Sequence, residues 1–367
     1  MSEGEAKHAI GLMSGTSMDG IDVAALVTDG RNLIEVGPAR EYAYTSVQTA
    51  ELTKAVDIGA SADDPDALRK ELSRVERQLT RWHAEAVARF ERETGWRASL
   101  VGFHGQTVAH RPQLGWTLQL GDGVALARAT GRVVVHDFRT ADMEAGGEGA
   151  PLVPVYHEGL CRPLFDADTR CIAVVNIGGI ANATVLRPGT PPSAFDCGPG
   201  NVLLDRWVQR EVGVPYDAGG RIASEGRVVR EWIDDEFAKP FFKRKGPRSL
   251  DRLDFELPEP AALDVSDGAR TLARFTAEAI ASSLRDEKPD LVVLCGGGRW
   301  NDVLVADLRH LLAGRVQVAE ALGWNGGATE AEAFAYLAVR SLRGDPITFP
   351  QTTGCRAPVT GGRTAQP

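Results

Sequence analysis

Short apolar runs alternate with helical spacing along most of the chain. Apolar runs at residues 9–13 and 21–27 predict two strands joined by a polar turn that contains glycine. Between residues 64 and 92, apolar positions recur at steps of three and four, which predicts one long amphipathic helix with Asp64 or Asp66 near its start. Further strands are expected at 99–103, 117–120 and 133–135. This order of elements is typical of an α/β protein.

A second strand–turn–strand unit follows later in the chain. Residues 172–176 and 183–186 predict two strands around a glycine turn, and helical or strand patterns continue at 202–212, 269–284, 291–295, 303–312 and 330–342. Two similar halves predict a duplicated α/β fold with a central cleft, where strand-end loops hold ligands.

We expect an N-terminal lobe of residues 1–140, against which residues 340–367 pack, and a C-terminal lobe of residues 141–340. The Gly-, Pro- and Thr-rich tail from 354 to 367 predicts a loose end.

Composition and charge narrow the class of protein. The chain has 367 residues, of which 43% are hydrophobic and 25% charged, enough for two packed cores. A formal net charge of −9 without a long Lys/Arg run disfavours nucleic-acid and anionic-membrane partners. Five scattered cysteines favour free thiols in a reducing compartment. Neither a signal peptide nor a spanning segment of ~18 apolar residues is evident, so we expect a soluble, cytoplasmic protein.

Three glycine turns are candidates for binding phosphate. Residues 15–20, 178–179 and 296–298 each follow or interrupt an apolar strand. A single glycine turn is usually only a turn, but glycine also lets successive N–H groups approach an anion, and nearby hydroxyls and carboxylates suit phosphate and hydrated magnesium. Neither a P-loop nor a dinucleotide fingerprint is present. The seven histidines lack metal-ligand spacing, so we predict no tightly bound transition metal.

Motifs spread over most of the chain carry a family resemblance. They are Gly11-Leu-Met-Ser-Gly-Thr-Ser-Met-Asp-Gly-Ile-Asp22, His104-Gly-Gln-Thr107, Asp137-Phe-Arg139 with Asp142, Gly146-Gly-Glu-Gly-Ala-Pro-Leu152, Asn176-Ile-Gly-Gly-Ile-Ala-Asn182, Phe195-Asp-Cys-Gly-Pro-Gly-Asn201, Cys295-Gly-Gly-Gly298 and Glu330-Ala-Glu-Ala-Phe-Ala335. In this order they resemble the anhydro-N-acetylmuramic acid kinases. The resemblance implies the sugar kinase/Hsp70/actin superfamily, with duplicated ribonuclease-H-like lobes, and a homodimer.

The resemblance also implies a reaction. ATP with Mg2+ would phosphorylate O6 of 1,6-anhydro-N-acetylmuramic acid while water opens the ring at C1, giving N-acetylmuramic acid 6-phosphate. An inverting glycosidase needs an acid and a base, but here the γ-phosphoryl group replaces the acid. The resemblance assigns the base to Asp196 and makes Glu330 the best second carboxylate. Alternatively, Asp196 caps the following helix, although Asn201 is better placed, and Glu330 is a first-turn acid favoured by the helix dipole.

Binding roles follow from the same motifs. The nucleotide phosphates are assigned to Gly15, Thr16, Ser17, Met18, Asp19, Gly20, Ile21, Asp22, Gly178, Gly179 and Asn182, and adenosine to Gly296, Gly297, Gly298 and Asn301. Either Asp19 or Asp22 would hold magnesium through water. Candidate sugar contacts are His104, Gln106, Thr107, Asp137, Arg139 and Asp142, with Arg139 either pairing with the substrate carboxylate or forming a structural ion pair.

Departures and rival functions remain open. Glu148, Trp300 and residues 245–252 differ from the family pattern, which bears on substrate preference. One rival is another carbohydrate kinase of the same fold acting on a plain hydroxyl. The other is an actin- or Hsp70-like ATPase, disfavoured as a chaperone because little chain follows residue 340 to form a peptide-binding domain.

Overall fold

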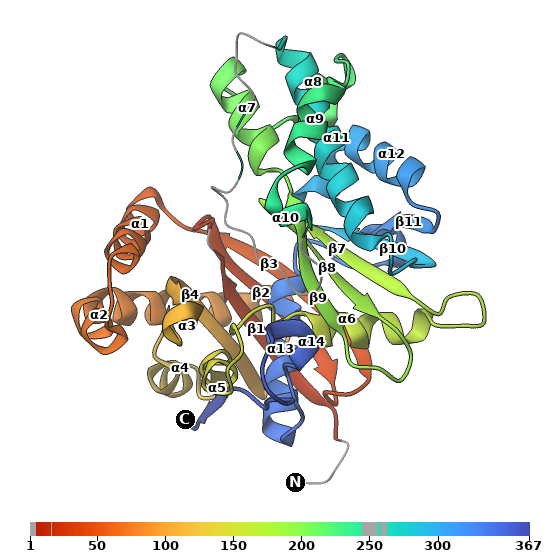
Figure 1. Ribbon diagram of the computed structural model, residues 1–367. Coiled ribbons are helices and arrows are strands. Elements are labelled where there is room, and N and C mark those ends of the chain that lie inside the picture. The colour runs from red at the N-terminus through yellow and green to blue at the C-terminus, as the bar shows by residue number, and fades with distance from the viewer. Residues whose placement is uncertain (1–4, 16, 244–254, 256, 258–262) are drawn as a thin grey trace. The chain divides into compact units, whose positions relative to one another are not determined.

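The computed structural model describes residues 5–15, 17–243, 255, 257 and 263–367 (Figure 1). It divides into unit 1, Met1–Leu160 with Ala328–Pro367, and unit 2, Cys161–Gly327. These boundaries differ from the expected 140 and 340. Residues 141–160 and 328–340 fall in unit 1 because Tyr156 and Glu332 join them by a buried hydrogen bond, 2.6 Å long, and the helix that contains Glu332 packs on the sheet of unit 1.

Unit 1 is built on a mixed sheet in the order β12-β6-β4-β1-β2-β3, with β5 paired to β4. Its strands are β1 (Lys7–Ser14), β2 (Gly20–Thr28), β3 (Leu33–Ala43), β4 (Leu100–Arg111), β5 (Trp116–Leu120), β6 (Val133–His136) and β12 (Arg363–Ala365). The strands β1, β2 and β3 are antiparallel neighbours, whereas β4 is parallel to β1 and β6 is parallel to β4. Strands β3, β2, β1, β4 and β6, in this order, therefore form the central part of the sheet of unit 1.

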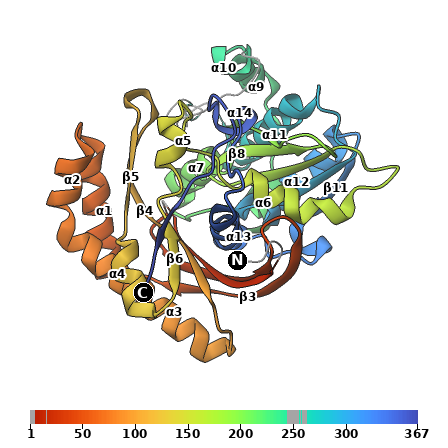
Figure 2. The same ribbon diagram turned by 90° about the horizontal axis from the view of Figure 1, so that it is seen from below.

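Helices cover both faces of this sheet. They are α1 (Ser46–Ala60), α2 (Pro65–Glu71), α3 (Ser73–Thr94), α4 (Gly123–Thr130), α5 (Thr140–Glu144), α6 (Pro154–Cys161), α13 (Thr329–Arg343) and α14 (Pro350–Thr353). Alternate residues of β1 point to opposite faces, so Ile10 and Leu12 pack with Phe90 of α3. On the other face α13 lies along the inner side of the curved sheet (Figure 2). This close packing requires glycine at Gly11, where a Cβ atom would lie 1.7 Å from the carbonyl oxygen of Ala331.

Unit 2 repeats the same topology with fewer strands. Its sheet has the order β11-β10-β7-β8-β9, from strands β7 (Ile172–Ile177), β8 (Ile180–Leu186), β9 (Ser193–Pro199), β10 (Leu291–Cys295) and β11 (Arg315–Val318). The first three are antiparallel neighbours, and β10 and β11 continue in parallel on the other side of β7. Strand order and directions match β3-β2-β1-β4-β6 of unit 1. The prediction of a duplicated, ribonuclease-H-like α/β fold is confirmed.

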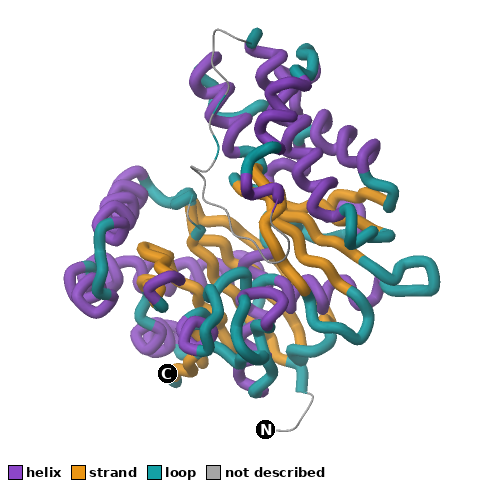
Figure 3. Tube along the Cα trace, in the orientation of Figure 1, coloured by secondary structure: helices purple, strands orange, loops and turns teal. Residues whose placement is uncertain are grey.

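The helices of unit 2 gather on one side of its strands (Figure 3). They are α7 (Val202–Val212), α8 (Arg221–Ser224), α9 (Arg230–Phe237), α10 (Pro240–Lys243), α11 (Val265–Leu284) and α12 (Asp302–Leu311). Ala277 and Ile280 of α11 and Leu304 of α12 pack on Val175 and Val292 of the sheet. A second cluster joins α7, α9 and α11 around the fully buried Trp207.

Several expectations need correction. The single helix predicted from 64 to 92 is two helices, because the chain turns at Leu72 before α3 begins. The tail is ordered rather than loose, since β12 pairs antiparallel with β6 from Arg363 to Ala365. The pattern also missed α1, β3 and β9. All five cysteines are free and buried, and within the described residues no helix is long and apolar enough to cross a membrane.

Candidate functional site

The loop between β1 and β2 is fixed by side chains from other parts of unit 1. At the end of β1, the Ser14 hydroxyl donates to Oε1 of Gln106 over 2.6 Å and lies 2.8 Å from the Tyr44 hydroxyl. The Gln106 amide in turn donates to the carbonyl of Gly15 over 3.2 Å. Gln106 is fully buried. Its observed contacts therefore position the loop, whereas the sequence analysis expected it to touch the sugar.

The loop presents a small set of polar groups. Ser17 and Asp19 are exposed, and the Ser17 hydroxyl donates to Oδ1 of Asp19 over 2.8 Å. The backbone of Asp19 accepts from the N–H of Tyr44 over 2.8 Å, and Met18 has a positive φ of 54°. Gly20 and Ile21 are buried at the start of β2, and Thr16 lies outside the described residues. The predicted phosphate loop thus offers Ser17, Asp19 and the half-buried Asp22 that follows.

Carboxylates crowd around Asp22. It pairs in register with Glu41 on β3, and burial together with the negative charges of Glu41, Asp19 and Glu330 raises its pKa to about 7. The side chain of Glu330, in the first turn of α13, is exposed, but the protein atoms packed around its carboxyl group raise its pKa, although the charge of Arg139 opposes this shift. Bringing four acids together costs free energy that a bound cation would offset.

This acidic group suits Mg2+. Among the described residues no group of three or more His, Cys, Asp or Glu side chains is arranged to hold a metal ion. Mg2+ usually keeps several waters and is bound through one or two carboxylates together with substrate phosphates, so it does not need such a cage. Asp19 and Asp22 match that requirement, and both remain candidates.

A buried histidine–arginine pair lies in the same unit. Nε and Nη2 of Arg139 donate to Nε2 of His104 over 3.1 and 2.8 Å, so Nδ1 of His104 carries the proton that is donated to the Gly105 carbonyl over 2.8 Å. Burial and the charge of Arg139 hold the pKa of His104 well below its usual value. Burial also lowers the pKa of Arg139 to about 10. His104 is thus neutral, and with the described residues Arg139 forms no side-chain ion pair of the kind considered as its alternative role.

The remaining predicted sugar contacts have structural partners. Asp142 is 1% exposed, and its two oxygens accept from the Gly149 N–H over 2.7 Å and the Thr353 hydroxyl over 2.6 Å. Asp137 pairs with Arg363 at 3.1 Å, and Thr107 accepts from Gln119 over 3.1 Å. Asp142 therefore supports the loop that ends at Gly149, while Asp137 and Thr107 are half-buried and partly accessible.

In unit 2 the turn between β7 and β8 is tied to the start of α7. The carbonyls of Gly178 and Gly179 accept from the N–H groups of Asn201 and Gly200 over 2.7 and 2.9 Å. This contact requires glycine at Gly200, because a Cβ atom there would lie 2.2 Å from the Gly178 carbonyl oxygen. Nδ2 of Asn201 donates to the Ile177 carbonyl over 3.1 Å, and its side chain does not cap α7. Asn201 thus occupies the N-cap position of α7, as its place in the sequence suggested, but its side chain bonds to the preceding turn.

Asp196 lies within β9, which is an edge strand of the sheet. Its backbone pairs in register with Asn182 of β8, and both side chains are half-buried. Asp196 precedes α7 by several residues and belongs to a strand, whereas Asn201 takes the N-cap position of that helix. This leaves a partly accessible carboxylate beside the β7–β8 turn. The neighbouring Cys197 is fully buried, as expected for a small core residue.

The third glycine turn borders a cavity of about 340 Å³ in unit 2. Gly297 and Gly298, in the 3-10 helix η5 (Gly297–Trp300), line it together with Asn301, whose side chain caps α12 at the Leu304 N–H over 3.1 Å. Gly296, beside them, accepts from the Arg299 guanidinium over 2.6 Å. This volume lies at the lower end of the usual range for small-ligand sites.

Several residues that line this cavity were not predicted as site residues from the sequence. They are Asn201, Leu204, Asp205, Tyr216, Asp217, Gly219 and Trp300, of which Asn201 and Trp300 had been noted for other reasons. Burial and the nearby Asp217 raise the pKa of Asp205 to about 6. Tyr216 stands just before the paired Gly219 and Gly220, and an aromatic residue beside such a loop was the pattern that could have identified it.

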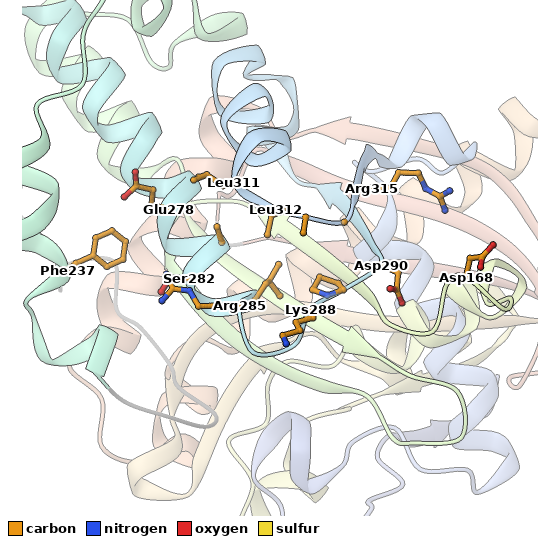
Figure 4. A pocket seen from close by; sticks show the side chains of 15 residues that line it. Asp168, Phe237, Glu278, Ser282, Arg285, Lys288, Asp290, Leu311, Leu312 and Arg315 are labelled. Carbon is orange, nitrogen blue, oxygen red and sulfur yellow. The ribbon is translucent and has the colours of Figure 1, made fainter.

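Another cavity, of about 1070 Å³, lies elsewhere in unit 2 (Figure 4). It is bordered by the end of α11, the segment before β10 and the segment between α12 and β11, with Arg285, Lys288 and Arg315 beside Asp168 and Asp290. None of the predicted site residues lines it. The smaller cavity, which Gly297, Gly298 and Asn301 line, is therefore the better candidate.

The sequence is similar to that of known proteins over nearly its whole length. A family model described as "Anhydro-N-acetylmuramic acid kinase" matches residues 7–366. Curated relatives of that name are 48% identical in Rhizobium etli (98% of this chain and 99% of the relative) and 46% identical in Agrobacterium fabrum (98% and 98%). A solved glucokinase from Streptomyces griseus, in complex with glucose and AMPPNP, covers 90% of this chain and 99% of its own at 14% identity and a TM-score of 0.42, which is too distant to add to the argument.

Proposed function

Because this chain belongs to the anhydro-N-acetylmuramic acid kinase family, we propose that it converts 1,6-anhydro-N-acetylmuramic acid, ATP and water into N-acetylmuramic acid 6-phosphate and ADP, in the recycling of cell-wall peptidoglycan. The observation that carries this proposal is the family match over residues 7–366, which spans both units and every motif described above. We place the reaction in the cytoplasm, where ATP is available, and expect a homodimer.

The reaction balances with one protein base. The oxygen of a water molecule bonds to C1 while the bond from C1 to O6 breaks, and O6 bonds to the γ-phosphorus as the bond to the β-phosphate oxygen breaks. One proton of the water passes to the base, and the other stays on the new C1 hydroxyl. The phosphoryl group captures the developing alkoxide, so no acid is needed to protonate O6.

Asp196 is our candidate for the base. It lies inside β9 rather than at the N-cap position of α7, and its partial accessibility suits a group that must reach water. General-base assistance typically contributes 10²–10⁴-fold to the rate. In unit 1 both ring nitrogens of neutral His104 are engaged, one by Arg139 and the other by the Gly105 carbonyl, so His104 orients Arg139. The two N–H groups of Arg139 that no described residue engages suit the substrate carboxylate.

Unit 1 would bind the nucleotide phosphates through hydrogen-bond donors and the magnesium ion through carboxylates. Ser17 and the loop backbone suit phosphate oxygens, and Asp19 or Asp22 would hold Mg2+ through water. When bound, Mg2+ neutralises charge on the phosphates. Glu330 faces the same acidic group, and its place in the first turn of α13 fits either an orienting role toward water or sugar or, when ionised, stabilisation of the start of this helix.

The direct test is the identity of the product. Incubation with Mg-ATP and the anhydro sugar should give a product heavier by one water and one phosphoryl group, measured by mass spectrometry. Unbridged N-acetylmuramic acid serves as the matched substrate. If it is phosphorylated as fast as the bridged sugar, the protein is an ordinary sugar kinase, and if ATP hydrolysis does not depend on sugar, it is an ATPase of another class.

A further inference from the structure

Two exposed aromatic side chains border the same cavity in unit 2. Among the described residues, the large hydrophobic side chains that remain strongly exposed are five aliphatic ones and two aromatic ones, Tyr216 at 60% and Trp300 at 56%. Both aromatic residues line the 340 Å³ cavity. Exposed aromatic rings lose the stabilisation that burial would give, so two of them around one cavity indicate a surface that binds a ligand.

The guanidinium group of Arg299 lies against one face of the Trp300 ring. The guanidinium carbon of Arg299 lies 4.5 Å from the centre of the Trp300 ring. Arg299 is 8% exposed, forms an ion pair with Glu320 of η6 (Ala319–Leu322) at 2.8 Å and donates to the Gly296 carbonyl over 2.6 Å. Because these contacts hold the buried guanidinium in place, the Trp300 indole that packs against it is preorganised at the cavity. Much of the indole surface remains accessible to a ligand.

Polar groups of the cavity complement a nucleoside. Asp205 is half-buried, and its carboxylate forms no hydrogen bond or ion pair with another described residue. The carboxylate of Asp217, in contrast, accepts from the N–H groups of Ile222 and Ala223 over 2.9 and 3.0 Å. Asp205 is therefore available to accept from sugar hydroxyls, and a flat ring beside Trp300 would complete the ligand.

We propose that Trp300 stacks on the adenine base of bound ATP and, together with Tyr216, determines how strongly this protein binds the base. The inference rests on the proposed function only in taking ATP as the nucleotide. Aromatic rings stack on any base through their π faces, so Trp300 contributes affinity more than discrimination among bases.

Binding measurements without sugar test this proposal. Titration of the protein with Mg-ATP, Mg-ADP and inorganic tripolyphosphate by calorimetry gives each Kd. Trp300→Ala should raise the Kd for ATP and ADP by about tenfold, the lower part of the range for loss of one stacking contact. Binding of tripolyphosphate should not change, and Trp300→Phe should retain most of the affinity. The matched control is Leu114→Ala, which removes a residue that is 60% exposed in unit 1.

The outcomes separate this inference from the proposed function. If Trp300→Ala leaves the Kd of ATP unchanged, or weakens tripolyphosphate equally, stacking is refuted even when the sugar is phosphorylated normally. If ATP binding depends on Trp300 but the anhydro sugar is not converted, the proposed function fails and the inference stands. In turnover, stacking predicts a higher KM for ATP with little change in kcat at saturation, whereas a merely structural role predicts lower stability without that split.

Discussion

The two units share a strand order but fix their first turn in different ways. In unit 1 the β1–β2 loop is held by side chains, chiefly Gln106 and Tyr44, and leaves Ser17 and Asp19 exposed. In unit 2 the β7–β8 turn is held by backbone hydrogen bonds from Gly200 and Asn201. The same topology therefore gives an oxygen-rich, charged loop in one unit and a tight uncharged turn in the other. The two units thus share their strand arrangement, but the β1–β2 loop and the β7–β8 turn differ in the chemical groups that they present.

The largest expected effect concerns the acid of unit 2. Asp196→Asn should lower kcat by about 10²–10⁴-fold because the water loses its base. Affinity for Mg-ATP, measured by calorimetry, should stay within twofold. The matched change in unit 1 is Asp19→Asn, which should shift the Mg2+ dependence rather than abolish the chemical step at saturating metal. Normal turnover by Asp196→Asn would remove Asp196 from the mechanism.

Two glycine substitutions test how the turns are held. Gly200→Ala places a Cβ atom 2.2 Å from a backbone carbonyl and should lower the free energy of unfolding by about 3 kcal/mol. Gly15→Ala meets no atom closer than 3.4 Å and should change stability by less than about 1 kcal/mol. Urea unfolding followed by circular dichroism measures both. Equal losses would show that the two turns are equally constrained.

Stability should also depend on pH through a buried acid of unit 1. Glu332 is 2% exposed, one of its oxygens has no partner among the described residues, and burial raises its pKa from 4.5 to about 7 despite the hydrogen bond from Tyr156. An acid with a higher pKa in the folded state binds its proton more tightly there. Its contribution is complete below pH ~4.5 and is lost as the pH rises toward 7.

Glu332→Gln removes this dependence while it keeps an acceptor for Tyr156. Relative to the variant, the wild type should lose roughly 2 kcal/mol of unfolding free energy between pH 5 and pH 8. Asp205→Asn in unit 2 is the matched change, with a smaller effect that falls between pH ~4 and pH 6, because Asp205 is less buried and its pKa is raised from 3.8 to about 6. Parallel pH profiles for wild type and Glu332→Gln would contradict the assignment.

The sequence predicted what depends on local pattern and motif. The apolar runs of β1, β7 and β10 identified strands, and the duplication followed from two similar halves. The pattern missed β9, since the run that carries Asp196 ends in Gly198 and Pro199, and its pairing with β8 is set by tertiary contacts. The pattern also did not predict that Gln106 and Asp142 are buried and hold neighbouring loops in place. A motif identifies residues with a role in a site, but it does not show whether they contact the ligand or position another residue.

The cavity of about 340 Å³ in unit 2 was the least predictable part of the candidate site. Tyr216, Asp205 and Trp300 come from separate segments of unit 2, and only the folded chain brings them around one space. Asp22 shows the same limit, because its raised pKa arises from Glu41 and Glu330, which lie far from it in sequence. Spacing along a chain does not reveal such long-range electrostatic groups.

The central claim is that water attacks C1 while the γ-phosphoryl group captures O6, with a single carboxylate as base. The most direct test is to run the reaction in water enriched in oxygen-18 and to locate the label by mass spectrometry before and after removal of the phosphate. We predict one labelled oxygen, retained on the sugar at C1, and none in the phosphate. Label in the transferred phosphate, or an unlabelled sugar, would contradict the account.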